Sequence, residues 1–141
     1  MPRVVPFLQL VLCILLAGSA GAESLLSETP LTDQPGDATR GLAIIRDPSR
    51  ASCLICHSIA SLPDKDQGGL GPPLDGVAEI YDAGQLRQRI IDARRGNPIT
   101  IMPPYFTTDG LFRVGERWEG QTIYTAQDVE DVVAFLLTLK D

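Results

Sequence analysis

Apolar side chains recur at helical spacing in three separate parts of this 141-residue chain. Within residues 38–46 they share one face of a helix, and within 83–95 they repeat at i, i+4 and i+7. A broader apolar stripe follows Thr125, formed by Val129, Val132, Val133, Phe135, Leu136 and Leu139. The pattern predicts an all-α domain with three main helices.

Polar residues stand where each of these helices should begin. Asp37, Asp82 and Thr125 precede the three apolar patterns, and their side chains can accept hydrogen bonds from the first backbone N–H groups of a helix. Asp128 stands at the position where a capping box places an acid relative to Thr125, although Glu or Gln is more usual there. The sequence therefore marks three helix N-termini.

The ends of the first two helices are also marked. The first should stop at Asp47-Pro48, because the residue before a proline avoids helical backbone angles. The second should stop at Gly96, a residue type common just after a helix. Gly41 lowers helix propensity in the middle of the first helix. We expect it to allow close approach to the last helix, with Phe135 nearby.

Between the helices the chain is rich in glycine and proline. The stretch "PDKDQGGLGPPLDG" covers residues 63–76, and "TIMPPYFTTDG" covers residues 100–110. The following stretch, "LFRVGERWEGQTIYT" at 111–125, alternates weakly between apolar and polar residues and predicts a short hairpin. Long loops in so small a domain need something to pack against. A large apolar cofactor would meet that need.

The first 22 residues predict a signal peptide. Arg3 gives a positive start, residues 7–17 are apolar except for one glutamine, and Ala20-Gly21-Ala22 fits a cleavage site. An uncleaved anchor is the alternative, but the apolar run is shorter than the roughly 20 residues of a membrane-spanning helix. Residues 23–36 have no helical period and predict a flexible leader.

Cleavage would change which chemistry-bearing residues remain. Cys13 would be lost, and Cys53 and Cys56 would then be the only cysteines, in an oxidising compartment. Met102 would be the only methionine. The full chain has a net charge of −6, and the cleaved chain would have 11 basic and 18 acidic residues. Such an acidic protein is a poor candidate for binding nucleic acid or anionic membranes, but it could meet a basic protein.

The pentapeptide Cys53-Leu54-Ile55-Cys56-His57 allows three interpretations. A closed zinc site needs four ligands, and the cleaved chain offers no second Cys/His pair. A dithiol redox switch would sit beside a strand–helix–strand unit, and no strong strand precedes Cys53. Covalent haem attachment needs two thiols at this spacing for thioethers to the haem vinyl groups, with the adjacent His57 on the iron. We favour haem c, because the motif, the export signal and the cysteine count agree.

Two further residues are candidates for the same site. Met102 could supply the second axial ligand, since His/Met ligation of haem is known and the following Pro103-Pro104 stiffens the loop. The alternative is a methionine that fills a gap in the core. A backbone carbonyl near Pro72 could accept the N–H of His57 and fix its ring. The alternative for Pro72 is an ordinary loop turn, and the residues alone do not separate the two.

Other charged and aromatic residues are less specific. Four arginines cluster on the second predicted helix, and we interpret them as a solvated face rather than a docking patch: Arg87, Arg89, Arg94 and Arg95. Tyr105, Trp118 and Tyr124 could reach a haem propionate, but we expect them to be packing residues. None of them is included in the candidate site.

The motifs "CLICH", "GPPLDG" and "IMPPY", followed by a capped helix, resemble the class I cytochromes c. In that family the proline carbonyl after the glycine contacts the haem histidine, which supports the expectation for Pro72. The stretches "GPPLDGVAEIY", "LRQRIIDARRGNPITIMPPY" and "TAQDVEDVVAFLLTL" are similar to the SoxX family, the small monohaem subunits of SoxAX cytochromes. This resemblance covers roughly residues 38–140 and implies a cytochrome c domain over 37–141.

The resemblance implies a site and a set of partners. Cys53 and Cys56 would bind one haem c covalently, and His57 and Met102 would be its axial ligands. The partners would be a SoxA-like cytochrome subunit in a heterodimer, the SoxY carrier and a small cytochrome c acceptor. The location would be the periplasm.

The implied role is electron transfer in bacterial sulfur oxidation. SoxAX joins thiosulfate to the carrier cysteine of SoxY, and the SoxX subunit accepts the electrons released. This chain would be the electron-accepting subunit of an L-cysteine S-thiosulfotransferase, with no catalytic residue of its own. Residues 106–125 have no counterpart in minimal cytochromes c, and we expect this insert to help form the SoxA interface.

Two other functions stay open. The chain could be a free-standing monohaem cytochrome c shuttle of another redox chain. It could also be a small haem enzyme or sensor with an open iron site, which would require Met102 to be off the iron.

Overall fold

The computed structural model describes residues 29–50 and 52–140. The signal peptide predicted over 1–22 and the first part of the leader lie outside these residues. The elements of the described chain are helical, and their order is α2 (Ala38–Arg46), η1 (Pro48–Arg50), η2 (Cys53–Ile55), α3 (Val77–Ile80), α4 (Ala83–Asp92), η3 (Ala93–Arg95), η4 (Glu116–Trp118) and α5 (Ala126–Leu136), where η is a 3₁₀ turn. None of these helices is long and apolar enough to cross a membrane.

The three predicted main helices are confirmed as α2, α4 and α5. Asp37 caps α2 by accepting a hydrogen bond from the Arg40 N–H at 2.8 Å. Thr125 and Asp128 form a full capping box at the start of α5. The second helix was predicted to reach residue 95, and its last three residues form the 3₁₀ turn η3 instead.

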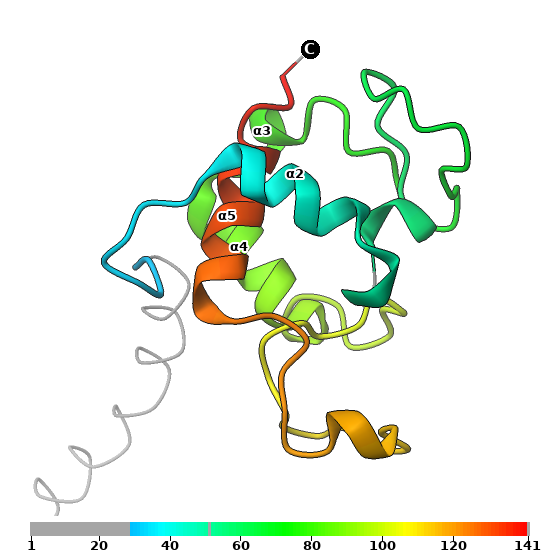
Figure 1. Ribbon diagram of the computed structural model, residues 1–141, viewed down its shortest axis with the longest axis vertical. Coiled ribbons are helices and arrows are strands. Elements are labelled where there is room, and N and C mark those ends of the chain that lie inside the picture. The colour runs from blue at the N-terminus through cyan, green and yellow to red at the C-terminus, as the bar shows by residue number, and fades with distance from the viewer. Residues whose placement is uncertain (1–28, 51, 141) are drawn as a thin grey trace, which may run out of the picture.

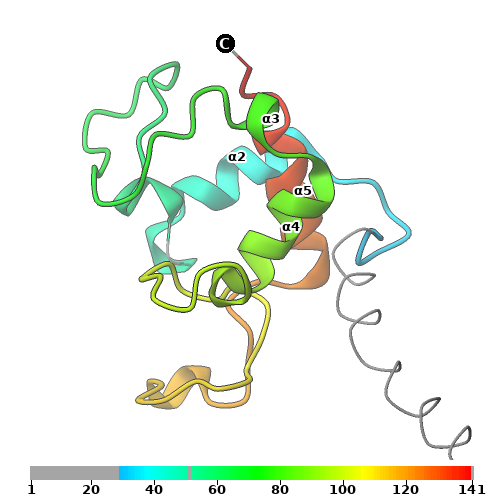
Figure 2. The same cartoon turned by 180° about the vertical axis from the view of Figure 1, so that it is seen from behind.

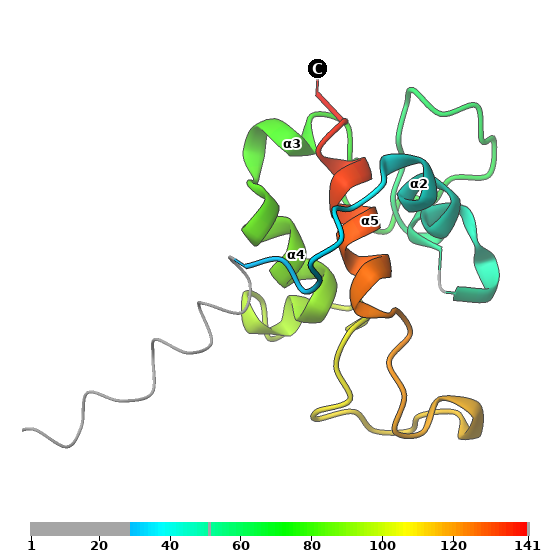
Figure 3. The ribbon, with the colours of Figure 1, turned by 60° about the vertical axis from the view of Figure 1, so that its left-hand side comes forward.

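Helix α5 lies between α2 on one side and α4 on the other (Figure 3). The contact with α2 is the most extensive of the helix pairs, and it depends on Gly41. A Cβ atom on Gly41 would overlap the Asp131 carbonyl and lie 2.8 Å from Cβ of Phe135. The expected close approach of Gly41 to the last helix near Phe135 is therefore confirmed.

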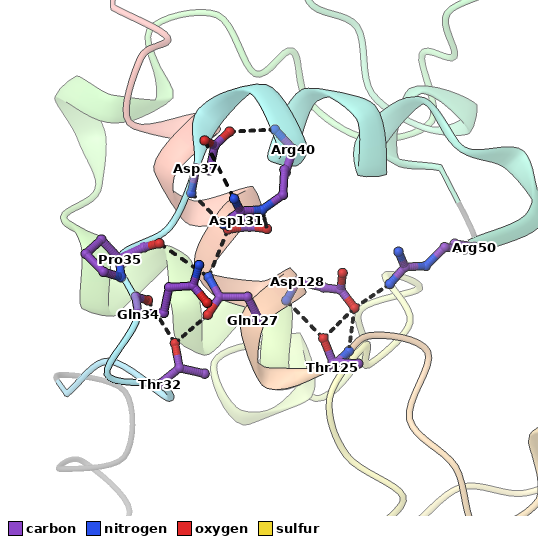
Figure 4. Close-up of polar contacts among 10 residues, drawn as sticks. All are labelled: Thr32, Gln34, Pro35, Asp37, Arg40, Arg50, Thr125, Gln127, Asp128 and Asp131. Carbon is purple, nitrogen blue, oxygen red and sulfur yellow. Dashed lines mark hydrogen bonds and ion pairs between the residues drawn. The ribbon is translucent and has the colours of Figure 1, made fainter.

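Two consecutive carboxylates on α5 tie it to both neighbouring helices. Asp131 accepts hydrogen bonds from Arg40 of α2 at 2.6 and 2.7 Å (Figure 4). Glu130 accepts from Arg87 of α4 at 2.7 and 2.8 Å, and both of these side chains are buried. Burial opposes the charge of Glu130, but the hydrogen bonds from Arg87 hold its pKa below the ordinary value. The expectation that Arg87 belongs to a solvated face is wrong.

The segment before α2 also lies against α5. The Leu31 N–H donates to Glu130 at 2.9 Å, and the Thr32 hydroxyl donates to Gln127 at 2.8 Å. The Asp37 N–H donates to Asp131 at 2.8 Å (Figure 4). The described end of the predicted flexible leader is thus held by the same helix that carries the two carboxylates.

The hairpin predicted over residues 111–125 is wrong, since the described residues contain no strand. This insert projects from the helical body (Figures 1 and 2) and contains the 3₁₀ turn η4. Its backbone turns at Gly110, Arg113 and Gly120, all with positive φ angles. Arg113 stands inside the stretch predicted to be extended, and its positive φ interrupts the geometry that a paired strand needs. The four-residue helix α3 was not predicted, because it is shorter than a recognisable helical period.

We expect Gly41→Ala to destabilise the protein by about 1–3 kcal/mol, because overpacking the α2–α5 contact outweighs the gain in helix propensity. The midpoint of thermal unfolding measures the effect. Gly115→Ala is the matched control, since a Cβ there meets nothing within 4 Å. A Gly41→Ala protein as stable as the control would contradict the close approach.

Candidate functional site

The Cys53–His57 pentapeptide follows α2 as a tight turn. The Ser52 hydroxyl donates to the Ile45 carbonyl at 2.5 Å and accepts from the Leu54 N–H at 3.2 Å. The His57 N–H then donates to the Cys53 carbonyl at 2.9 Å. These bonds fix Cys53, Cys56 and His57 on the wall of a cavity of about 770 Å³.

The cavity brings together all five predicted site residues. Cys53, Cys56 and His57 come from the pentapeptide, Pro72 from the first long loop and Met102 from the second. Faces of α3, α4 and α5 complete a mostly apolar lining. The volume lies within the range of about 300–1,000 Å³ that is usual for sites of small molecules and cofactors.

His57 is held by the loop that crosses the pentapeptide. Its Nδ1 donates to the Pro72 carbonyl at 2.7 Å, since a carbonyl can only accept. This bond selects the tautomer in which Nε2 keeps a free lone pair, the form that binds metal ions. The ring lies so close to Gly71 that a Cβ there would overlap it. The Gly71-Pro72 pair therefore sets both the position and the tautomer of His57.

The loop that carries Met102 is fixed on both sides of that residue. The Met102 N–H donates to the Thr100 hydroxyl at 3.2 Å. Further along, the Tyr105 N–H donates to the Ile90 carbonyl of α4 at 3.1 Å. Because Pro103 follows directly, Met102 has little backbone freedom at the cavity wall.

Two tyrosines that no sequence motif marks as site residues form part of the cavity wall. The rings of Tyr105 and Tyr124 stack with centroids 4.6 Å apart, and only 1% of Tyr124 is exposed. Burial raises the pKa of both side chains above the ordinary value, so both are neutral phenols. The Tyr124 hydroxyl has no hydrogen-bond partner within the described residues. The only sequence signal that Tyr124 would lie on the cavity wall was its position directly before Thr125, the cap of α5.

The surroundings of Cys53 argue against dithiol exchange. Burial raises the pKa of Cys53 to about 11. A redox-active cysteine pair instead has a lowered pKa, because the thiolate is the reactive form. The arrangement of Cys53 suits a thiol that faces a bulky apolar group.

Comparison with known families decides the class of protein. Residues 41–140 match the family described as Cytochrome c. The chain belongs to the cytochrome c family. Among solved structures, it is similar to a chain in the "Crystal structure of SoxXA from P. pantotrophus", with 36% identity and a TM-score of 0.74. The match covers 80% of this chain and 88% of that chain, and it supports the predicted resemblance to SoxX. A search of curated proteins found no match.

A covalently bound haem c is the cofactor of this family. The cavity fits such a group in three ways. Its lining is mostly apolar, it offers an imidazole nitrogen and a thioether sulfur, and Gly71 leaves room for the imidazole ring. The partnerless hydroxyl of Tyr124 is a further sign that this wall faces a ligand.

We expect Gly71→Ala to disturb His57, because the added methyl group would overlap the imidazole ring and weaken its bond to Pro72. The fraction of low-spin haem should fall, as measured by resonance Raman spin-state bands. Gly69→Ala is the control in the same loop, since a Cβ there meets nothing within 4 Å. Equal spin-state bands in the two variants would show that His57 does not depend on Gly71.

Proposed function

We propose that Cys53 and Cys56 bind haem c through thioethers and that His57 and Met102 are its axial ligands. The observation that carries this proposal is the convergence of these four residues on one cavity, with His57 held by Pro72 at 2.7 Å. Haem, when bound, supplies a one-electron Fe(III)/Fe(II) couple. If His57 and Met102 both bound the iron, the chain itself would leave no position for a substrate, which is what electron transfer requires.

We further propose that the protein is the periplasmic electron-accepting subunit of a SoxAX-type complex. The match to a chain of SoxXA over most of both chains supports this role. In the reaction a sulfur–sulfur bond forms between thiosulfate and the cysteine of the SoxY carrier, the thiol proton is released, and two electrons leave. A monohaem subunit takes these electrons one at a time and passes each to a small cytochrome c. The predicted signal peptide agrees with a periplasmic location.

An apolar rim around the cavity suits contact with another protein. Leu70, Ile80, Ile99 and Ile101 all line the cavity, yet each is between 67% and 89% exposed. Exposed apolar side chains gathered at one opening mark an interaction surface more often than scattered ones do. We propose that this rim faces the redox partners of the haem.

The insert at 106–125 offers a second apolar contact. Phe112 is 83% exposed on a segment that projects from the helical body (Figure 1). Arg94 holds the base of the segment by donating to the carbonyls of Asp109 and Gly110. We propose that the insert packs on the SoxA-like subunit, where Phe112 would be buried.

The direct test of the proposed function mixes the purified holoprotein with a SoxA-like cytochrome, the SoxY carrier and thiosulfate. We expect the haem of this chain to become reduced only when all three are present, as followed by its visible absorption bands. Reduction without the SoxA-like subunit, or no association with it, would favour the free-standing shuttle.

The same mixture tests the insert. Phe112→Ser should weaken association with the SoxA-like subunit, while Ala43→Ser serves as the control, because Ala43 is exposed on α2 and lies outside the insert and the cavity. Equal affinities of the two variants for the SoxA-like subunit would show that the insert is not part of the interface.

We expect Met102→Ala to lower the reduction potential, because thioether ligation favours ferrous haem, and to open the iron to added ligands. Potentiometric titration and carbon monoxide binding measure the two effects. An unchanged potential with no carbon monoxide binding would show that Met102 is not an axial ligand.

A further inference from the structure

One carboxylate lies at the wall of the cofactor cavity, and the proposed electron transfer does not use it. Asp92 is the last residue of α4 and the only acidic residue among the described residues that line the cavity. It is only 7% exposed. A buried negative charge is costly unless a cation or hydrogen bonds compensate it. The groups that compensate Asp92 therefore bear on the whole site.

Arg94 is hydrogen-bonded to Asp92 through both its side chain and its backbone. Nε and Nη2 of the guanidinium donate to the two carboxylate oxygens at 2.7 and 2.8 Å, and the Arg94 backbone N–H donates at 3.1 Å. These bonds hold the pKa of Asp92 below its ordinary value, so the carboxylate is ionised at neutral pH. The contact is a two-pronged fork, which lysine cannot reproduce.

The one arginine among the described residues that line the cavity is directed to other groups. The guanidinium carbon of Arg89 lies 3.7 Å from the ring centroid of Tyr81, and Nη1 of Arg89 donates to the Gln85 carbonyl at 3.0 Å. Arg94 is thus the arginine that reaches the Asp92 carboxylate, although its own side chain is 30% exposed and does not line the cavity.

The same guanidinium holds the base of the insert at 106–125. Nη2 of Arg94 donates to the Asp109 carbonyl at 2.8 Å, and Nη1 donates to the Gly110 carbonyl at 3.2 Å. Gly110 has a positive φ angle, so the chain turns at this point. One side chain therefore contacts a carboxylate of the cavity wall and the base of the segment that projects from the helical body (Figure 1).

We propose that Arg94 is a positioning residue that holds the insert in place and compensates the charge of Asp92 beside the haem. This inference rests on the proposed haem site. Ferric haem carries one more positive charge than ferrous haem, so an uncompensated carboxylate nearby would stabilise the ferric state. The reduction potential and the order of the insert therefore depend on the same side chain.

The test measures two properties of purified Arg94→Gln holoprotein. We expect its reduction potential at pH 8 to be lower than that of wild type, because Asp92 stays ionised several units above the ordinary pKa of an aspartate. We also expect trypsin to cleave after Arg113 and Arg117 several-fold faster, because both residues are exposed within the loosened insert. Mass spectrometry identifies the two cuts.

Arg46→Gln is the matched control. Arg46 forms the same kind of fork with Asp64, and its side chain is 34% exposed, close to the 30% of Arg94. Neither Arg46 nor Asp64 lines the cofactor cavity. The control removes the same charge from a similar pair, and we expect neither the potential nor the two cuts in the insert to change.

Two further variants separate charge from folding. Asp92→Asn removes the carboxylate and should raise the reduction potential above that of wild type, the opposite direction from Arg94→Gln. A general loss of structure in both variants would not produce opposite shifts. Arg94→Lys keeps the positive charge but loses the fork. It should speed the two cuts in the insert, while its potential stays closer to wild type than that of Arg94→Gln.

The outcomes distinguish this inference from the proposed function on which it rests. An Arg94→Gln potential no lower than that of the Arg46→Gln control would overturn the inference, and so would an unchanged rate of cleavage in the insert. A lower potential in Asp92→Asn would also overturn it. If acid and organic solvent extract the haem from wild type, the proposed covalent attachment itself fails. Retained haem with an unshifted potential overturns only the role of Arg94.

Discussion

The hydrogen bond from His57 Nδ1 to the Pro72 carbonyl is the contact on which the site depends. It joins the pentapeptide to a long loop that has no regular structure between residues 63 and 76. In addition, the Gly68 N–H donates to the Leu54 carbonyl and the Gly71 N–H donates to the Cys56 carbonyl, so the same loop crosses the pentapeptide. One loop therefore closes a wall of the cavity and sets the tautomer of the proposed iron ligand.

Helix α5 supports this arrangement from behind. Its buried Glu130 and Asp131 pair with arginines from α4 and α2, and the segment from Leu31 to Asp37 binds the same two carboxylates. The Arg87–Glu130 pair is buried on both sides, and removing one partner of such a pair costs about 3–5 kcal/mol, because it leaves the other charge unpaired. These pairs fix the two helices that flank α5, and the cavity walls rest on α4 and α5. Helix α5 therefore both holds the helices together and forms part of the cavity.

The features that could be predicted from the sequence are those that depend on the type of a single residue. Asp37, Asp82 and Thr125 marked the helix starts, and Gly41 marked the α2–α5 contact, because caps and close approaches need particular residue types. The sequence did not predict the buried pair of Arg87 with Glu130, since those residues are 43 positions apart and each also suits a solvated face. The same limit applies to Tyr124, which only the fold brings to the cavity wall beside the pentapeptide residues.

The insert shows another limit of pattern reasoning. Its weak alternation resembled a hairpin, but the described residues contain no strand, and the positive φ of Arg113 interrupts the stretch that would have been extended. The fold class and the residues that gather at the cavity could be predicted, because the C-x-x-C-H motif and Met102 each have few chemical uses. The way in which the two long loops bring the motif and Met102 to one cavity could not be predicted, because these loops have no periodic pattern.

The central claim is that the chain supplies both axial ligands to a covalently held haem. The long-wavelength absorption spectrum of the purified ferric protein tests it most directly. The account predicts the weak charge-transfer band that arises when methionine sulfur is bound to ferric haem iron. A spectrum without that band, with high-spin ferric haem in its place, would contradict it.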